Sequence, residues 1–202
     1  MSNNIKLNFI NKSNDVNNSS VVIFQKNIAD NFDKPTTAWK VIHKPKSMDN
    51  HPIDYTTNFQ IATSDSHGNN TPKLTAHNGS AFEVVENTTG DVLQNSSTPA
   101  MNLEEIEVRN NLTRGAINAN CYRNGKLLAS KINVSPGQKA VFKFNPSIYI
   151  GTASEIEEGE FLNSAIISQI NTEINLLGIN SADIVMTGGG SEPFKFSLEN
   201  VR

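Results

Sequence analysis

The stretch 115–151 constrains the fold most strongly, because two turn sequences separate runs in which apolar and polar residues alternate. Asn124-Gly125 is a pair that readily adopts positive φ at both central positions of a two-residue hairpin turn. Pro136-Gly137 suits a second turn, in which proline sets φ at the first corner and glycine supplies a positive φ at the next. The stretch therefore predicts three consecutive antiparallel strands, at 116–123, 126–134 and 139–144.

Short apolar runs between polar turns recur along the rest of the chain. Residues 5–10 alternate in polarity, and the run VVIFQK at 21–26 is typical of a strand that is covered on both faces. Asparagine, serine and threonine are abundant, and their side chains favour turns over helix interiors because they compete for backbone hydrogen bonds. The sequence therefore predicts an all-β fold, an antiparallel β-sandwich of the Greek-key or jelly-roll kind.

One segment, 161–177, fits two structures. Leu162, Ile166, Ile170 and Ile174 recur at helical spacing, and Gly178 suits the end of a helix. The same run also alternates in polarity and is rich in β-branched residues, which favour strands. We predict a strand here, with one short helix as the alternative.

The length of 202 residues suits one β-sandwich domain, 1–202. Residues 94–102 combine asparagine, serine, threonine and proline and are the most linker-like segment of the chain. An alternative organisation is therefore two related halves, 1–98 and 103–202.

Charge and composition exclude some functions. The net charge of −3 and the isoelectric point near 5.8 predict no nucleic-acid partner, since such proteins carry a basic surface. The first residues lack a basic region followed by an apolar one, and no apolar run reaches the length of a membrane-spanning helix. We therefore expect a cytoplasmic protein, with release by a signal-independent route and membrane association left open.

The four histidines lie within one window, 43–77, which raises the possibility of a metal site. The candidate ligands are His43, His51, Asp65 and His67. Their spacing does not place two imidazoles on one face of a strand or helix, so exposed loop histidines are the favoured interpretation and no cofactor is predicted. Residues 65–70 have some oxygen ligands of a calcium loop but lack its final acidic residue, which favours an ordinary Asx turn.

Four aromatic residues could offer a surface for stacking on a sugar: Trp39, Tyr55, Tyr122 and Tyr149. Of these, Trp39, Tyr55 and Tyr149 are the candidates for ligand binding. Asp65 and Asn69 could add polar contacts, and the five residues together form the candidate ligand-binding set. Trp39 has an alternative role in the core, because Ala38 and Val41 are apolar.

Two further features predict structure rather than chemistry. Cys121 is the only cysteine and lies within a predicted strand, so we expect a small buried hydrophobic residue and neither a disulfide nor a nucleophile. The glycines at 188–190 lack the context of a phosphate-binding loop and predict a flexible turn.

No catalytic pattern stands out, and we expect a non-enzymatic β-sandwich that acts through its surface. Its partner would be a small ligand such as a glycan, or further copies of the chain in a homo-oligomer. The first alternative is a membrane-active or toxin-like β protein, in which 161–177 would insert or rearrange. The second is a metal-dependent enzyme that uses the loops of 43–77.

Overall fold

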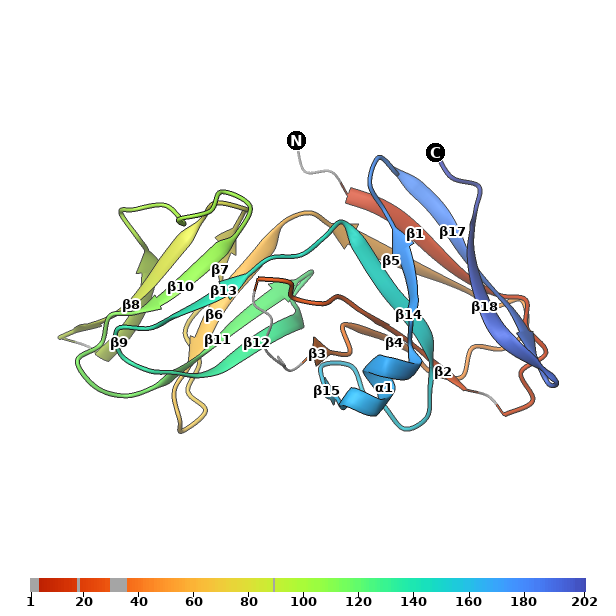
Figure 1. Cartoon of the computed structure of the whole chain (residues 1–202), viewed down its shortest axis with the longest axis horizontal. Coiled ribbons are helices and arrows are strands. Elements are labelled where there is room, and N and C mark those ends of the chain that lie inside the picture. The colour runs from red at the N-terminus through yellow and green to blue at the C-terminus, as the bar shows by residue number, and fades with distance from the viewer. Residues whose placement is uncertain (1–3, 18, 30–35, 89) are drawn as a thin grey trace. The chain divides into compact units, whose positions relative to one another are not determined.

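A computed structural model describes residues 4–17, 19–29, 36–88 and 90–202, and it is nearly all β, with 54% strand and 3% helix (Figure 1). The predicted all-β, sandwich-like fold is confirmed. The chain forms two compact units that alternate along the sequence. Unit 1 contains Met1–Gln25, Thr36–Thr57 and Pro146–Arg202, and unit 2 contains Lys26–Pro35 and Asn58–Asn145.

Unit 1 contains two four-stranded sheets, one short two-stranded ribbon and the only helix of the described residues. The first sheet has the order β18-β17-β1-β5: β18 is Glu192–Glu199, β17 Ser181–Gly189, β1 Asn4–Asn11 and β5 Asn50–Thr56. The second has the order β16-β14-β2-β4: β16 is Thr172–Asn175, β14 Ser147–Ala153, β2 Ser20–Phe24 and β4 Lys40–Ile42. The ribbon pairs β3, Thr36–Thr37, with β15, Phe161–Leu162.

The strands of unit 1 follow from their burial patterns. β1 alternates between buried and more exposed positions, as expected for a strand with one covered face. Every residue of β2 is buried, which confirms the prediction that this strand is covered on both faces. β1 runs parallel to β17, so strands near the two ends of the chain are neighbours, as the red and blue arrows of Figure 1 show.

The segment 161–177 forms both of the structures that its sequence fits. The predicted strand is wrong at α1, Ser164–Gln169, and right at β16. Asn163 caps α1, because its side chain accepts a hydrogen bond of 2.9 Å from the backbone N–H of Ile166. After the helix, Ile170 packs against Gly151, where an added Cβ would lie 2.7 Å from Ile170 Cγ1. The chain therefore returns to the sheet through a contact that only glycine allows.

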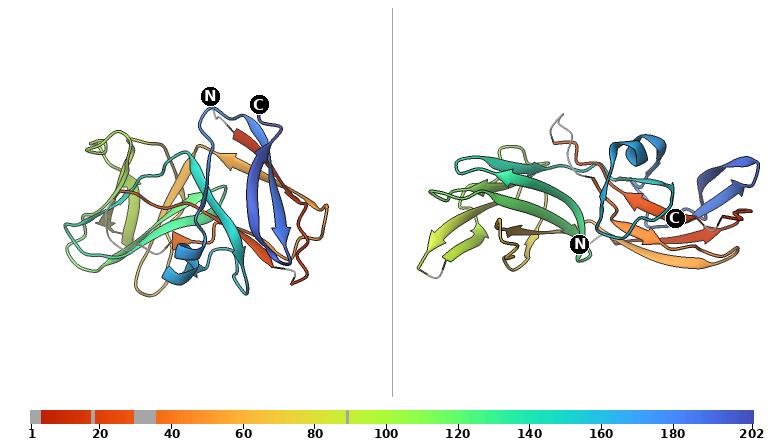
Figure 2. Two further views of the ribbon diagram at one scale, coloured as in Figure 1. Left: turned by 45° about the vertical axis from the view of Figure 1, so that its right-hand side comes forward. Right: turned by 90° about the horizontal axis from the view of Figure 1, so that it is seen from below.

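Unit 2 contains two further sheets, and most of its strands are drawn in yellow to teal in Figure 2. The first has the order β13-β10-β8-β9: β13 is Lys139–Phe142, β10 Ile106–Asn110, β8 Ala81–Asn87 and β9 Gly90–Asn95. In the second, the strands of unit 2 run in the order β12-β11-β6-β7: β12 is Lys126–Val134, β11 Ile117–Arg123, β6 Phe59–Ser64 and β7 Leu74–Ala76.

The predicted hairpin between β11 and β12 is confirmed. Asn124 and Gly125 have φ of 53° and 77°, the positive values that the two-residue turn requires. Pro136-Gly137 also forms the predicted turn, with φ of 76° at Gly137.

The third predicted strand of this stretch does not continue the hairpin. β13 pairs with β10, in the other sheet of unit 2. The side chain of Asn110 donates a 2.9 Å hydrogen bond to the carbonyl oxygen of Val134, and the backbone carbonyl oxygen of Asn110 accepts a 2.8 Å bond from Gly137 N–H. These bonds tie the chain after β12 to the end of β10. They direct it from the sheet of β11 and β12 into the sheet of β10.

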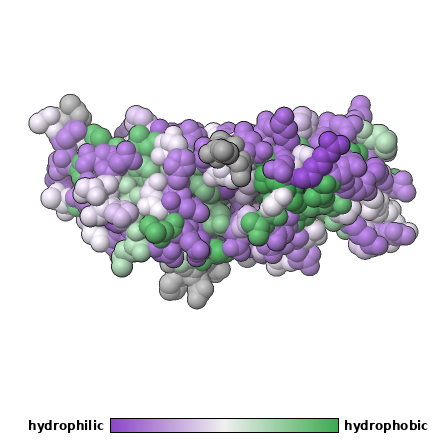
Figure 3. Space-filling model, turned by 90° about the horizontal axis from the view of Figure 1, so that it is seen from above, coloured by the Kyte–Doolittle hydropathy of each residue, from purple (hydrophilic) through white to green (hydrophobic). Residues whose placement is uncertain are grey.

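Hydrophilic side chains cover most of the molecular face drawn in Figure 3, with hydrophobic groups between them. Among the exposed large hydrophobic residues are Met101, Leu103 and Leu177. Two of these three lie in the segment between β9 and β10.

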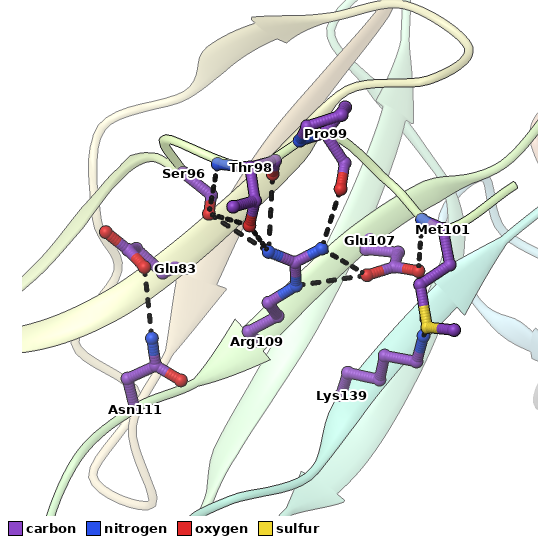
Figure 4. A network of polar contacts seen from close by, with 9 residues as sticks. All are labelled: Glu83, Ser96, Thr98, Pro99, Met101, Glu107, Arg109, Asn111 and Lys139. Carbon is purple, nitrogen blue, oxygen red and sulfur yellow. Dashed lines mark hydrogen bonds and ion pairs between the residues drawn. The ribbon is translucent and has the colours of Figure 1, made fainter. Parts of the chain in front are cut away.

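The linker-like residues 94–102 form the end of β9 and part of the segment between β9 and β10, which lie within unit 2 and do not separate the two units. Buried Glu107 on β10 accepts bonds of 2.7 Å from Lys139 and 2.8 Å from Arg109, and a 3.0 Å bond from the backbone N–H of Met101 (Figure 4). Arg109 also donates to Thr98 and to the carbonyl oxygen of Pro99. This polar clamp, Glu107 with Arg109 and Lys139, holds the segment on β10.

Candidate ligand-binding site

A cavity of about 580 Å³ lies in unit 2, between residues of β6, β7 and β11 and residues of β8 and β9. Its size is typical of a site for a small organic molecule. The apolar lining residues are Pro72, Leu74, Val84, Val92, Leu93 and Ile117. The polar lining residues are Thr63, Ser64, Asp65, Asn69, Asn70, Thr71 and Asp91.

The loop after β6 brings several of the polar residues together. Asp65 Oδ1 accepts hydrogen bonds of 2.8 Å from His67 N–H and 2.9 Å from Asn69 N–H, and its Oδ2 accepts a 2.7 Å bond from the side chain of Asn69. Gly68 has φ of 85°, which allows the tight return of the chain. This confirms the Asx-turn interpretation, and the carboxylate is held in place by its own loop.

Hydrogen bonding also favours the charged form of Asp65. The side chain of Asn69 lowers the pKa of Asp65 most, burial opposes this, and the two backbone N–H groups lower the pKa further. The carboxylate is therefore ionised at neutral pH.

The opposite side of the cavity has a second carboxylate, Asp91, on β9. In the β8–β9 pairing Val84 faces Leu93 and Glu86 faces Asp91. Residues two apart on a strand share a face, so Glu86 and Asp91 lie on the face that contributes Val84 and Leu93 to the cavity. Asp91 is exposed, and within the described part of the chain its side chain makes no hydrogen bond or ion pair.

Of the five predicted ligand-binding residues, the structure brings Asp65 and Asn69 together at this cavity. Trp39 and Tyr55 meet in unit 1, with ring centroids 6.0 Å apart, but they are 2% and 3% exposed. Tyr149 stacks on Phe24 at 5.4 Å. Trp39 therefore has the core role given as its alternative, and the buried rings of Trp39 and Tyr55 leave no face for a sugar.

The four predicted metal ligands do not gather into one group among the described residues. His43 Nε2 lies 3.5 Å from Glu157, and His51 Nε2 lies 3.9 Å from Asp49. His67 donates its backbone N–H to Asp65. No group of three or more His, Cys, Asp or Glu residues in the described ranges is placed to hold a metal ion, so the metal site stays a prediction without a structural cluster to support it.

Cys121 is fully buried on β11, as expected from its position in the sequence. Burial raises the pKa of its thiol to about 12, although nearby Arg123 opposes the shift.

We expect a thiol-reactive disulfide reagent to leave Cys121 unmodified in the native protein at pH 8 and to modify it when denaturant is added, because the reactive thiolate is scarce and inaccessible. The release of the chromophore measures the reaction. Stoichiometric modification of the native protein would contradict the buried setting of this thiol.

The sequence did not indicate the residues of the cavity that come from β8, β9 and β11. Leu93 and Ile117 are ordinary strand residues whose shared cavity depends on which sheets face each other.

Comparison with known proteins finds no family model that matches the chain, no similar curated protein and no similar solved structure. The cavity and the residues around it are therefore the basis for a functional proposal.

Proposed function

We propose that the protein is a non-enzymatic binding protein that takes a small organic ligand in the cavity of unit 2. The cavity itself is the observation that supports this proposal, because a volume of about 580 Å³ with apolar walls and a polar rim is the usual form of such a site. The loop of Asp65 and the strand of Asp91 would orient the polar part of the ligand, and Leu74, Leu93 and Ile117 would contact its apolar part.

The structural support around the cavity also suits a binding site. The loop residues at its rim are tied to one another: Thr63 N–H donates a 2.9 Å bond to Thr71 Oγ1, and Thr71 N–H donates a 2.9 Å bond to the carbonyl oxygen of Thr63. A rim that is ordered before binding lowers the entropic cost of association.

We expect Leu74→Trp to abolish binding of small molecules, because the indole would occupy the cavity that half-buried Leu74 lines. Thr75→Trp is the matched control: it places the same ring on the adjacent, exposed residue of β7, on the opposite face of the strand. Saturation-transfer NMR with a panel of small alcohols, amines, carboxylic acids and monosaccharides measures binding to the wild type and to both variants.

Binding that survives in Leu74→Trp, or that falls equally in the two variants, would contradict the proposed site. Both residues lie on an edge strand, where an aromatic residue is well tolerated, so a loss of fold is not the expected cause of lost binding.

Self-assembly, glycan binding and membrane activity stay predictions. Within the described residues, no helix has both the length and the apolar character that crossing a membrane requires. Leu177 and Phe161, at the ends of the segment expected to insert, are exposed.

A further inference from the structure

We infer that the ligand of the unit 2 cavity is an organic cation with an apolar body, such as an alkylammonium compound. This inference rests on the proposed function, and it specifies the chemistry of the ligand for that same cavity. It depends on the charge of the rim, the composition of the walls and the pairing of β8 with β9.

The rim supplies negative charge from two directions. Asp65 comes from the loop after β6 and Asp91 from β9, on the two sides of the cavity. The carboxylate of Asp65 accepts three hydrogen bonds from its own loop, which fix its position while leaving lone pairs for a further donor. Asp91 makes no ion pair among the described residues, so none of their charged side chains compensates its charge.

Glu86 on β8 adds a third negative charge next to Asp91. Glu86 lies directly opposite Asp91, and like charges at such positions repel each other. The side chain of Glu86 likewise makes no hydrogen bond or ion pair within the described residues. A bound cation beside Asp91 would relieve this repulsion, whereas a bound anion would increase it.

The remaining lining residues narrow the choice of ligand. Lysine, arginine and histidine are absent from the described residues that line the cavity, so none of these side chains could form an ion pair with an anion. Tryptophan, tyrosine and phenylalanine are absent as well, so a sugar would find no ring to stack on. Leu74, Leu93 and Ile117 instead offer aliphatic contact to an alkyl chain.

Three probes with chains of six carbons test which ligand charge the cavity prefers: hexylammonium, 1-hexanol and hexanoate. Each is titrated into ¹⁵N-labelled protein at pH 7 and low salt, and the amide shifts of the 65–71 loop and of β9 give the affinity. We expect hexylammonium to bind about tenfold more tightly than hexanol and hexanoate to bind most weakly. Asp91→Asn should weaken the binding of hexylammonium by roughly two- to fivefold and leave the affinity for hexanol unchanged. Glu192→Gln, on β18 of unit 1, should change neither affinity.

The possible outcomes separate the two proposals. Equal affinity for hexylammonium and hexanol at the cavity would overturn the inference about charge and leave the proposed binding function standing. The inference would also be overturned if hexylammonium shifted only amide signals of residues outside the cavity. Failure of all three probes to shift the cavity residues, together with no binding from the wider panel, would overturn the proposed function itself.

Discussion

Glu107→Gln is expected to lower the free energy of unfolding by about 2–4 kcal/mol, because it leaves two cations on β10 and β13 without their shared carboxylate. The Glu107 side chain is 0% exposed, while those of Arg109 and Lys139 are 21% and 37% exposed. Partial access of water to the two cations keeps the expected loss below that of a fully buried network. Urea denaturation measures the change.

Glu104→Gln is a matched control for this substitution. Glu104 pairs with Lys143 at 2.6 Å, close to the 2.7 Å between Glu107 and Lys139, but its side chain is 71% exposed. Because an exposed pair is screened by water, we expect little change in stability. Equal losses in the two variants would contradict the role assigned to burial in the polar clamp.

The polar clamp should also make stability depend on pH. Burial raises the pKa of Glu107, but the hydrogen bonds it accepts, above all that from Lys139, outweigh this and hold the pKa below its ordinary value. A lowered pKa in the folded state stabilises the protein above the pKa of the unfolded chain, near 4.3, and this contribution is lost as the pH falls through the folded-state value. The stability difference between wild type and Glu107→Gln should therefore shrink as the pH falls below about 5. A difference that stays constant down to pH 3 would contradict this.

Gly188→Ala is expected to lower the free energy of unfolding by about 2–4 kcal/mol. Gly188 has φ of 84°, and an added Cβ would overlap the carbonyl oxygen of Pro193 on the neighbouring strand. The β17–β18 register shifts at this point, between Thr187 and Gly189, so the clash cannot be relieved without moving the bulge. Thermal or chemical denaturation measures the loss.

Gly190→Ala separates the clash from the effect of backbone conformation. Gly190 also has positive φ, 66°, but an added Cβ would meet no atom within 4 Å. We expect a cost of about 1 kcal/mol, which reflects φ alone. Equal costs in Gly188→Ala and Gly190→Ala would show that the contact with Pro193 has no energetic weight.

The local structure of this protein could be predicted where the chemistry of a turn is decisive. Asn124-Gly125, Pro136-Gly137 and the Asx turn at Asp65 form the expected geometry, because each depends on residues adjacent in the sequence. The partner of β13 could not be predicted in the same way. Its pairing with β10 depends on the side chain of Asn110, which contacts a residue 24 positions away. In 164–169, the cap at Asn163 favoured a helix over the strand expected from composition.

The candidate site was only partly accessible from the sequence. Asp65 and Asn69 were in the predicted ligand-binding set because of their side-chain chemistry, and they do line the cavity. Trp39 and Tyr55 were in it for the same reason, and burial in unit 1 removes them from any surface. Asp91 was missed because its significance lies in its position: it faces the cavity through the β8–β9 register and lies opposite Glu86.

A crystal structure of the protein soaked with hexylammonium tests the central claim most directly, since it shows where a small ligand lies. We expect ordered density for the alkyl chain against Leu74, Leu93 and Ile117, with the ammonium group near Asp65 and Asp91. Density for the compound on another surface, with the cavity of unit 2 filled by protein side chains, would contradict it.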